Sequence, residues 1–345
     1  MASEPDAGAL LTAAAAGDRR ATGRVLSAIE AGGPTGRELE RATFAPSGPA
    51  WVVGLTGPPG AGKSTIGGIL AARLRAAGER VALVAVDPTS ACSGGALLAD
   101  RARLSLAPSE GDDGVLVRSM ASRHALDGLA PASRSVVRAL EWLGWGVVVV
   151  ETVGAGQVGT GVAAACDTTV LVLTPESGDD LQAAKAGPLE VADVVVVNKA
   201  DRLGAAAAVA TVTGEVGAAG GREGAPEVVA TAALAGEGID ELVAALGRHR
   251  RRLAEPAGDG GTVKEHRRRR ALEAELEARL GAELTRVGAR ARAGPGFAEA
   301  VAGLVAGTWD PARACELVLG PVLAAGLRAP GDRPGEGRRG RDGRR

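Results

Sequence analysis

Six short apolar runs, separated by stretches with helical spacing, constrain the fold of this chain more than any other feature. Each run is rich in β-branched residues and shows no polar alternation, which is typical of strands buried on both faces. Strands of this kind that alternate with helices form a doubly wound, mostly parallel sheet, so an α/β fold with helices on both sides is predicted. The runs span residues 51–56, 80–87, 144–152, 168–174, 192–198 and 226–230.

The segments on either side of these runs predict helices only. Residues 8–32 carry apolar side chains at helical spacing and end in a glycine pair, so we expect a helical hairpin there and a loop up to the first strand. After about residue 256 we expect one long charged helix and two more helices. The predicted domains are an N-terminal helical segment 1–45, the α/β domain 46–255, a C-terminal helical region 256–327 and a disordered basic tail 328–345.

Composition argues against several classes of function. The 40 basic and 41 acidic residues give a formal net charge of -1, which does not favour a dedicated nucleic-acid-binding protein. No apolar run approaches the roughly 18 residues that cross a bilayer, so no membrane partner is expected. Cys92, Cys166 and Cys315 form no CxxC pair, which fits a reduced, cytoplasmic location without a disulfide framework.

A glycine-rich motif follows the first predicted strand and precedes a helical stretch. Residues 57–64 read GPPGAGKS and match GxxxxGK[ST]. In this context the backbone amides face a β-phosphate, the lysine reaches the β and γ oxygens, and the serine hydroxyl binds magnesium. We therefore predict a nucleoside phosphate site, with Lys63 also catalytic through charge neutralisation. Its residues are Gly57, Pro58, Pro59, Gly60, Ala61, Gly62, Lys63, Ser64 and Thr65.

The sequence NKAD at residues 198–201 stands at the end of another predicted strand and could read a base. A carboxylate at Asp201 accepts from the N1–H and the 2-amino group of guanine, whereas adenine offers no donor at those places, so GTP is preferred to ATP. Lys199 can lay its alkyl stem along the base, and Asn198 can tie the motif to the phosphate loop. After the next strand come Ala232, Ala233 and Leu234, where the Ala233 amide could donate to guanine O6.

Further acidic and polar residues are candidates for the metal and the γ-phosphate. Asp87 and Glu151 each end a predicted strand and could join Ser64 around magnesium, with Glu151 also counted as catalytic. The Gly154 amide could sense the γ-phosphate. Asp100 could complete the metal shell when GTP is bound, and Gln157 could orient the attacking water. An ordinary role at a strand end or on the surface stays open for these residues.

Taken together, these segments resemble the MeaB/ArgK family of GTPases, which assist adenosylcobalamin-dependent acyl-CoA mutases such as methylmalonyl-CoA mutase. The resemblance is carried by GLTGPPGAGKST, VAVDPTSACSGGALLADRAR, ETVGAGQ, GDDLQAAKAG and LEVADVVVVNKAD. It implies a homodimeric GTPase of the SIMIBI class whose helical ends help it dimerise. It also implies that the protein gates the delivery of cofactor to the mutase and protects it, with an adenosyltransferase as a further candidate partner.

The resemblance also implies that Asp180, Gln182 and Lys185 lie in a segment that couples the nucleotide state to the mutase. Three positions depart from the family pattern: Val158, Ala186 and Ala232. No arginine finger can be assigned among Arg101, Arg103 and Arg123. Two alternatives therefore stay open: an ATP-using kinase or ATPase linked to amino-acid transport, and a protein that binds nucleotide without hydrolysing it.

Overall fold

The computed structural model describes residues 6–45, 48–87, 112–121, 132–152, 160–163, 165–176, 187–218, 225–258 and 260–326. The chain forms two compact units, residues 1–272 and residues 273–345. The division falls inside the long helix α11 (Val263–Ala293), whose first turns belong to the first unit. Each unit is described by itself.

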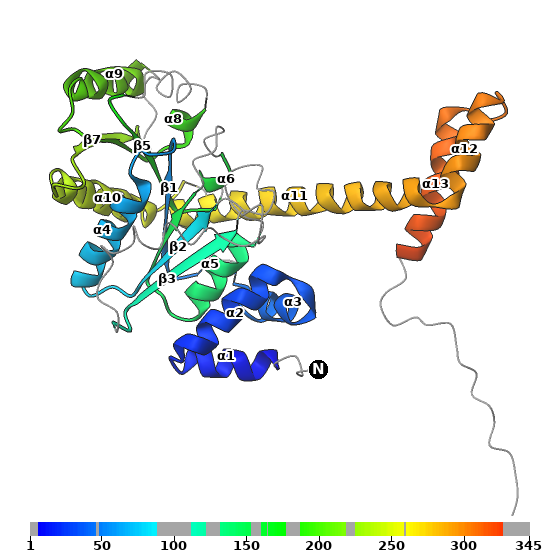
Figure 1. Ribbon diagram of the computed structural model, residues 1–345, viewed down its shortest axis with the longest axis horizontal. Coiled ribbons are helices and arrows are strands. Elements are labelled where there is room, and N and C mark those ends of the chain that lie inside the picture. The colour runs from blue at the N-terminus through cyan, green and yellow to red at the C-terminus, as the bar shows by residue number, and fades with distance from the viewer. Residues whose placement is uncertain are drawn as a thin grey trace, which may run out of the picture. The chain divides into compact units, whose positions relative to one another are not determined.

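Within the described residues, the first unit is built on one sheet of seven parallel strands in the order β3-β2-β4-β1-β5-β6-β7 (Figure 1). The predicted α/β fold is confirmed. Since every strand runs the same way, all the carboxyl ends meet at one edge of the sheet. The strands are β1 (Trp51–Thr56), β2 (Val81–Asp87), β3 (Val115–Ala121), β4 (Val147–Glu151), β5 (Thr168–Leu173), β6 (Val194–Asn198) and β7 (Glu227–Thr231).

Strand β3 was not among the six predicted strands. It pairs with β2 along its whole length, from Val81↔Val115 to Asp87↔Ala121. Its sequence, VLVRSMA, contains Arg118 and Ser119 because an edge strand has only one neighbour and is half-buried in its centre. The rule that detects strands buried on both faces therefore misses it.

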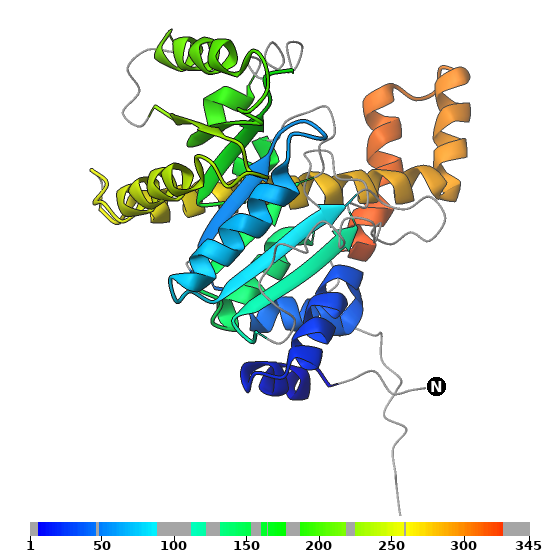
Figure 2. The ribbon, with the colours of Figure 1, turned by 60° about the vertical axis from the view of Figure 1, so that its left-hand side comes forward.

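Helices cover both faces of the sheet, which is why the central strands carry apolar residues on both faces (Figure 2). Alternate strand residues such as Val53 and Leu55 face α4 (Lys63–Ala76) and α10 (Ile239–Leu253). Their neighbours, such as Val52, face α1 (Ala7–Ala15), α2 (Arg19–Ala31) and α5 (Ser133–Trp142), and the short helix α6 (Thr160–Ala163) joins this layer. Near β5 and β6 the layer is continued by α8 (Pro188–Val191) and α9 (Ala205–Ala218).

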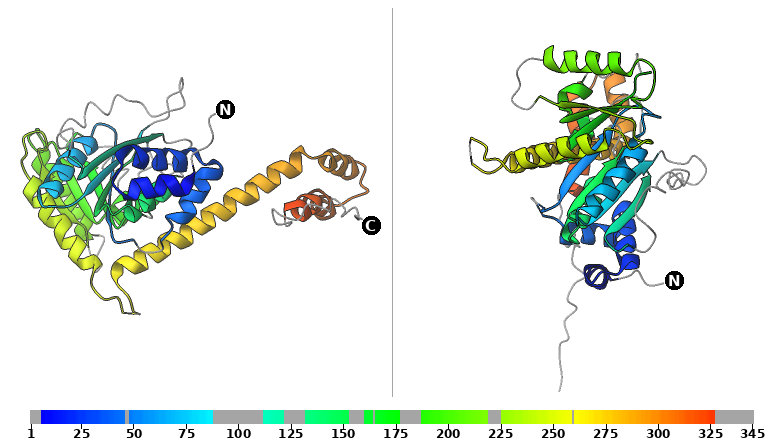
Figure 3. Two further views of the ribbon diagram at one scale, coloured as in Figure 1. Left: turned by 90° about the horizontal axis from the view of Figure 1, so that it is seen from below. Right: turned by 90° about the vertical axis from the view of Figure 1, so that its left-hand side faces the viewer.

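The N-terminal helices follow the predicted hairpin and add a third helix where a loop was expected (Figure 3). Gly32 ends α2 with φ 77°, and Pro34 starts α3 (Gly33–Ala42) at a position that tolerates a missing N–H. Gly36 lies so close to α2 that a Cβ would stand 2.3 Å from the Ala28 carbonyl oxygen, and Leu39 is fully buried. The Gly-Gly-Pro sequence that indicates a loop is thus a junction between two helices.

Helix α2 also caps the free edge of β3. The Arg19 guanidinium donates to the Asp112 and Val115 carbonyl oxygens, both at 3.0 Å. At the other end of the strand, Glu30 accepts from the Ala121 N–H at 3.1 Å and from Arg118 at 2.6 Å. Side chains of one helix therefore satisfy backbone groups at both ends of a strand that lies at the edge of the sheet formed by the described residues.

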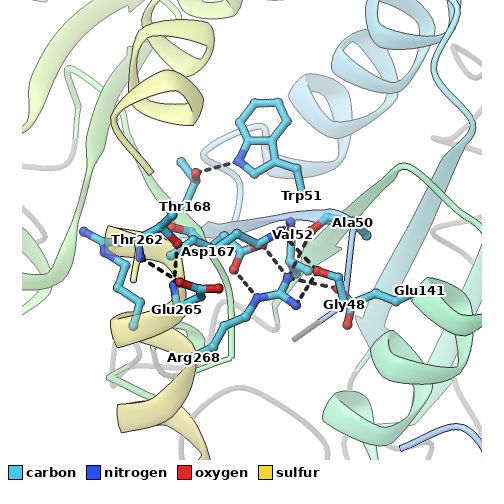
Figure 4. A network of polar contacts seen from close by, with 12 residues as sticks. Gly48, Ala50, Trp51, Val52, Glu141, Asp167, Thr168, Thr262, Glu265 and Arg268 are labelled. Atoms are coloured by element: carbon cyan, nitrogen blue, oxygen red, sulfur yellow. Dashed lines mark hydrogen bonds and ion pairs between the residues drawn. The ribbon is translucent and has the colours of Figure 1, made fainter. Parts of the chain in front are cut away.

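A buried polar network lies at the amino edge of the sheet, where the strands begin, beside the first residues of β1 and β5 (Figure 4). Asp167 accepts from the Val52 N–H at 2.9 Å and from the Arg268 guanidinium at 2.8 Å. Asp193 pairs with the neighbouring Arg267 at 2.6 Å. Two adjacent arginines of α11 thus hold the start of that helix against the sheet.

The same network continues through Trp51, whose indole N–H donates to Thr168 Oγ1 at 2.8 Å. Thr168 Oγ1 lies 2.8 Å from His249 Nδ1, and His249 Nε2 lies 3.2 Å from Asp193. Burial alone would raise the pKa of Asp193, but hydrogen bonds from His249 and Arg267 lower that pKa to about 2. Asp193 is therefore ionised and paired at any neutral pH.

The second unit contains the rest of α11 together with α12 (Pro295–Val305) and α13 (Pro311–Gly326). These helices match the long charged helix and the two further helices expected from the sequence. Trp309 packs on Gly303, where an added Cβ would stand 2.6 Å from the indole. Among the described helices of the whole chain, none combines the length and the apolar character that a membrane span requires.

Candidate nucleotide site

Most of the predicted site residues that the structure describes lie at the carboxyl edge of the sheet. Strand β1 leads into the glycine-rich loop, β4 ends at Glu151, β6 ends at Asn198 and β7 ends at Thr231. In open α/β sheets this edge is where ligands bind, because loops and helix N-termini converge there.

The backbone of the glycine-rich loop requires glycine at two positions. Gly57 has φ 141°, and a Cβ there would stand 2.1 Å from the Val172 carbonyl oxygen on β5. Gly62 has φ 95°, and its Cβ would stand 2.3 Å from Asn198 Nδ2. The loop then passes directly into α4, whose N-terminus has no side-chain cap. A helix start of this kind presents backbone N–H groups to an anion.

Lys63 is the first residue of α4, and its side chain is buried across the loop. Its ammonium group donates to the carbonyl oxygens of Gly57 at 3.0 Å and Pro58 at 2.9 Å. These contacts hold the positive charge over the loop, beside the N-terminus of α4. The arrangement places a fixed cation where an anionic ligand of that helix start would lie.

Ser64 and Glu151 come together from different elements. The Ser64 hydroxyl donates to Glu151 Oε1 at 2.6 Å. The register of β1 and β4, with Leu55 opposite Glu151, sets this contact, and Thr152 reinforces it by donating its N–H to the Leu55 carbonyl oxygen at 3.1 Å. A hydroxyl and a carboxylate side by side are hard oxygen ligands, so the donor set fits a magnesium ion.

One carboxamide joins three loops of the site. Asn198 is buried, and its Nδ2 donates to the Ala61 carbonyl oxygen of the glycine-rich loop at 2.8 Å. Its Oδ1 accepts from the Ala233 N–H at 3.2 Å and from the Thr231 hydroxyl at 3.0 Å. The loops after β1, β6 and β7 are therefore fastened to each other through this single side chain.

The residues after Asn198 form a rim that is half-buried at Lys199 and exposed from Asp201 onward. Lys199 has φ 60°, a left-handed conformation that costs a residue with a Cβ of the order of 1 kcal/mol or more. Asp201 is exposed, and the neighbouring Arg202 pairs with Glu176, three residues after β5 ends. In the loop after β7, Leu234 is 90% exposed.

The loop after β7 has a fixed shape of its own. Ala232 and Glu237 form a backbone bridge, with hydrogen bonds of 3.1 and 3.3 Å. Gly238 closes the turn with φ 71°, where a Cβ would stand 2.0 Å from the Ala230 carbonyl oxygen. Ala232 and Ala233 are both buried in consequence. The Ala233 N–H, which the sequence assigns to guanine O6, here donates to Asn198.

Several predicted site residues lie outside the described residues. They are Asp100, Gly154, Gln157, Asp180, Gln182 and Lys185, together with Val158, Ala186 and the three candidate arginines. Asp87 is described by its backbone alone, as the last residue of β2 and the partner of Ala121. The structure thus places the phosphate loop, Glu151 and the NKAD segment at one edge of the sheet. The roles predicted for the residues outside the described ranges stay predictions.

The sequence analysis did not assign a role to Thr231. Its position one residue before the Ala232–Leu234 segment gave a weak signal, because a threonine at a strand end is common and its partner is 33 residues away. The signal that could have found it is register: Asn198 and Thr231 are paired residues at the ends of adjacent strands.

The parallel sheet, the glycine-rich loop with its buried lysine and the carboxamide link to an NKAD segment define a P-loop nucleotide-binding protein of the GTPase class. The chain belongs to the family described as "Methylmalonyl Co-A mutase-associated GTPase MeaB", whose sequence profile matches residues 22–287. It is therefore a GTPase by family, and the resemblance inferred from its motifs is confirmed.

Relatives agree with this assignment. A Pyrococcus abyssi protein named as a GTPase is 39% identical over 319 residues, which cover 90% of this chain and 95% of that protein. The mouse protein named methylmalonic aciduria type A homolog, mitochondrial, is 40% identical over 149 residues, 43% of this chain and 35% of its own length. A crystal structure described as a LAO/AO transport system kinase has a TM-score of 0.66 at 24% identity, covering 94% of this chain and 99% of that one, and shows the fold alone.

Proposed function

We propose that this chain hydrolyses GTP in a magnesium-dependent reaction and acts as a chaperone for a cobalamin-dependent acyl-CoA mutase. In this role the nucleotide state gates the loading of adenosylcobalamin and protects the loaded mutase from inactivation. The observation that carries the GTPase part is the link from Asn198 to Ala61, which joins a guanine-reading segment to a phosphate loop. The family description, which names methylmalonyl-CoA mutase, supports the choice of partner.

Hydrolysis at this site needs positioning and charge neutralisation more than covalent chemistry. Lys63 supplies a fixed positive charge for the β- and γ-phosphates. Ser64 and Glu151 would hold the magnesium ion, which neutralises phosphate charge when it is bound. Asp87 and Asp100 are proposed to complete its surroundings, the Gly154 amide to sense the γ-phosphate, and Gln157 to orient the attacking water.

Guanine is the base that the rim favours. The Asp201 carboxylate only accepts hydrogen bonds, so it selects a base edge that carries two donors. Lys199 and Leu234 offer apolar surface to the two faces of the ring. An adenine base would leave the carboxylate without a donor, which is the physical reason to propose GTP rather than ATP.

We expect the second unit to join two copies of the chain. Leu276, Leu280 and Leu284 are 60%, 56% and 69% exposed, and their spacing of four places them on one side of α11. Helix α12 also carries exposed Phe297 and Val301. Apolar rows of this kind need a partner surface, and a second copy of the same helical unit would supply one of matching character.

The test is GTP turnover by the full chain with magnesium, alone and with the cobalamin-dependent acyl-CoA mutase from the same genome. We expect slow turnover alone and a rise of at least about tenfold with the mutase, equivalent to roughly 1.4 kcal/mol of barrier lowering. Lys63→Ala should lose turnover in both conditions. The decay of mutase activity during catalysis is the second readout, and it should slow when the chaperone and GTP are present.

The outcomes separate the alternatives. Turnover without stimulation and without protection would contradict the mutase role and leave a GTPase with another partner. Tight GDP binding without phosphate release would favour a protein that binds nucleotide and does not hydrolyse it. Equal affinity for ADP and GDP would contradict the guanine assignment.

A further inference from the structure

The carboxyl end of β2 is supported from one side of the sheet. The pairing of β2 with β4 ends at Ala85, which lies opposite Glu151. The pairing of β2 with β3 continues two residues further, to Asp87 opposite Ala121. Among the described strands, only β3 therefore lies beside the last two residues of β2. Since β3 is itself at the edge of this sheet, the position of the Asp87 backbone depends on how firmly the end of β3 is held.

Glu30 of helix α2 binds the end of β3 with both oxygens of its carboxylate. Its Oε1 accepts from the Ala121 N–H at 3.1 Å, and its Oε2 accepts from the Arg118 guanidinium at 2.6 Å. Ala121 is only 2% exposed, so water is a poor substitute for the carboxylate at this N–H. A buried N–H without an acceptor is costly, and separation of the strand end from the sheet is the movement that relieves this cost.

The place of Glu30 in α2 does not favour its own helix. It is the next-to-last residue of α2, where a carboxylate meets the negative end of the helix dipole. The helix is nevertheless well anchored, since Val25 and Leu26 are fully buried in the core. The Glu30 side chain is 14% exposed and has one oxygen on each of its two partners. A firmly packed helix thus carries the carboxylate to a fixed point beside the end of β3.

We infer that Glu30 is a positioning residue for the magnesium site: it fixes the end of β3 and, through the register of β3 with β2, the backbone at Asp87. The inference rests on the proposed function, which assigns Asp87 to the surroundings of the magnesium ion. In this arrangement the N-terminal helices contribute to metal binding although Glu30 touches neither the metal nor the nucleotide.

The decisive change is Glu30→Met, which keeps the length of the side chain and removes both acceptor oxygens. With the end of β3 released, the dissociation constant for magnesium in the GDP complex should rise about fivefold, as expected for the loss of one hydrogen bond. Affinity for GDP without magnesium should stay within about twofold, because the phosphate loop and the NKAD segment follow β1 and β6. A general loss of stability would not separate magnesium binding from nucleotide binding in this way.

Two control variants separate the backbone contact from its surroundings. Arg118→Met removes the ion pair but leaves Glu30 as the acceptor for the Ala121 N–H, so it should change the magnesium constant by less than about twofold. Glu40 of α3 also joins an N-terminal helix to the α/β domain, but its partner at 2.6 Å is the Ser135 hydroxyl, on helix α5 rather than on a strand. Glu40→Met should likewise leave the magnesium constant within about twofold.

The experiment titrates magnesium into the GDP complex of the full chain by calorimetry, titrates GDP in the presence of EDTA, and records Tm for every variant. We expect the fivefold effect in Glu30→Met alone. The inference is overturned if Glu30→Met binds magnesium within about twofold of the natural chain, or if Arg118→Met or Glu40→Met weakens magnesium binding equally. It is also overturned if GDP affinity without magnesium falls by the same factor.

A second comparison covers the case in which Glu30→Met does not fold because Arg118 loses its counter-charge. The double variant Glu30→Met, Arg118→Met removes both members of the pair and is compared with Arg118→Met. Equal magnesium constants for these two proteins refute the inference.

The failure of the proposed function has a different signature. If the natural chain binds GDP but no magnesium, the proposed magnesium site fails, and the role of Glu30 in it is refuted as well. If the natural chain binds magnesium and Glu30→Met binds it equally well, only the role of Glu30 is lost.

Discussion

Gly62 offers a direct measure of how tightly the phosphate loop and the base-reading loop are packed. Its φ of 95° is a left-handed conformation, and a Cβ at this position would stand 2.3 Å from Asn198 Nδ2. Gly60, two residues earlier, has φ 75° but nothing within 4 Å of its Cβ position. The pair Gly62→Ala and Gly60→Ala therefore separates backbone strain from a collision with Asn198.

Two free-energy costs determine how strongly each glycine variant is destabilised. Placing alanine in the left-handed region costs about 1–2 kcal/mol at either glycine. At Gly62 the methyl group must also displace the Asn198 carboxamide, and the loss of its hydrogen bond to Ala61 costs about 1 kcal/mol more. We expect Gly60→Ala to destabilise the loop by about 1–2 kcal/mol and Gly62→Ala by about 2–3 kcal/mol. The difference corresponds to roughly a fivefold weaker affinity for GDP.

The assay is GDP titration calorimetry on both variants, together with their Tm values. The expected order of affinity is the natural chain, then Gly60→Ala, then Gly62→Ala. Asn198→Ala provides the cross-check, because without the carboxamide the extra cost of Gly62→Ala should disappear. Equal GDP affinities for the two glycine variants in the natural background would refute the packing argument.

Three further predictions test other parts of the molecule. Asp201→Asn should weaken GDP binding at least about hundredfold and improve binding of xanthosine diphosphate, because a carboxamide can donate to the 2-oxo group of xanthine; unchanged base preference in calorimetry would contradict this. The folded-state pKa of Asp193, lowered to about 2, contributes roughly 2 kcal/mol that is fully present above about pH 4 and lost as the pH falls towards 2. The Tm difference between the natural chain and Asp193→Asn should therefore be constant above pH 5 and shrink below pH 4, and a constant difference throughout would refute it. Leu280→Lys should convert a dimer to monomers in light scattering, whereas the same change at Leu203, 99% exposed in the first unit, should not; an unaltered mass for Leu280→Lys would exclude that row from the interface.

The parts of the fold that the sequence predicted are those set by local pattern. The central strands are buried on both faces, so their apolar runs are unbroken, and the glycine-rich loop stands between its strand and helix as its motif requires. Edge strand β3 was not predicted because it is only half-buried in its centre and carries Arg118 and Ser119 there, so its sequence is not an unbroken apolar run. Helix α3 was not predicted because Gly32 and Pro34, residue types that commonly interrupt helices, here join two helices.

Contacts between residues distant in sequence could not be predicted from pattern. The run HRRRR at 266–270 indicates a solvated helix face, yet Arg267 and Arg268 pair with buried carboxylates at the amino edge of the sheet. Asp167 and Asp193 each precede a strand and are typical of a loop. Within the candidate site, the link from Asn198 to the phosphate loop was expected from the sequence. Its contacts with Thr231 and Ala233 were not, because they depend on the three-dimensional register of β6 and β7.

Arg267 and Arg268, at the start of α11, are synthesised after the buried carboxylates that they neutralise. Asp167 and Asp193 are synthesised about a hundred and about seventy residues before their guanidinium partners. Until residue 268 has emerged from the ribosome, closing the amino edge of the sheet would bury two carboxylates without their full set of counter-charges, which is strongly unfavourable. The last strand among the described residues ends at Thr231, well before Arg267 and Arg268 in the chain. Helix α11 therefore supplies, after all of these strands, the counter-charges that the two buried carboxylates require, and the same helix leads into the second unit.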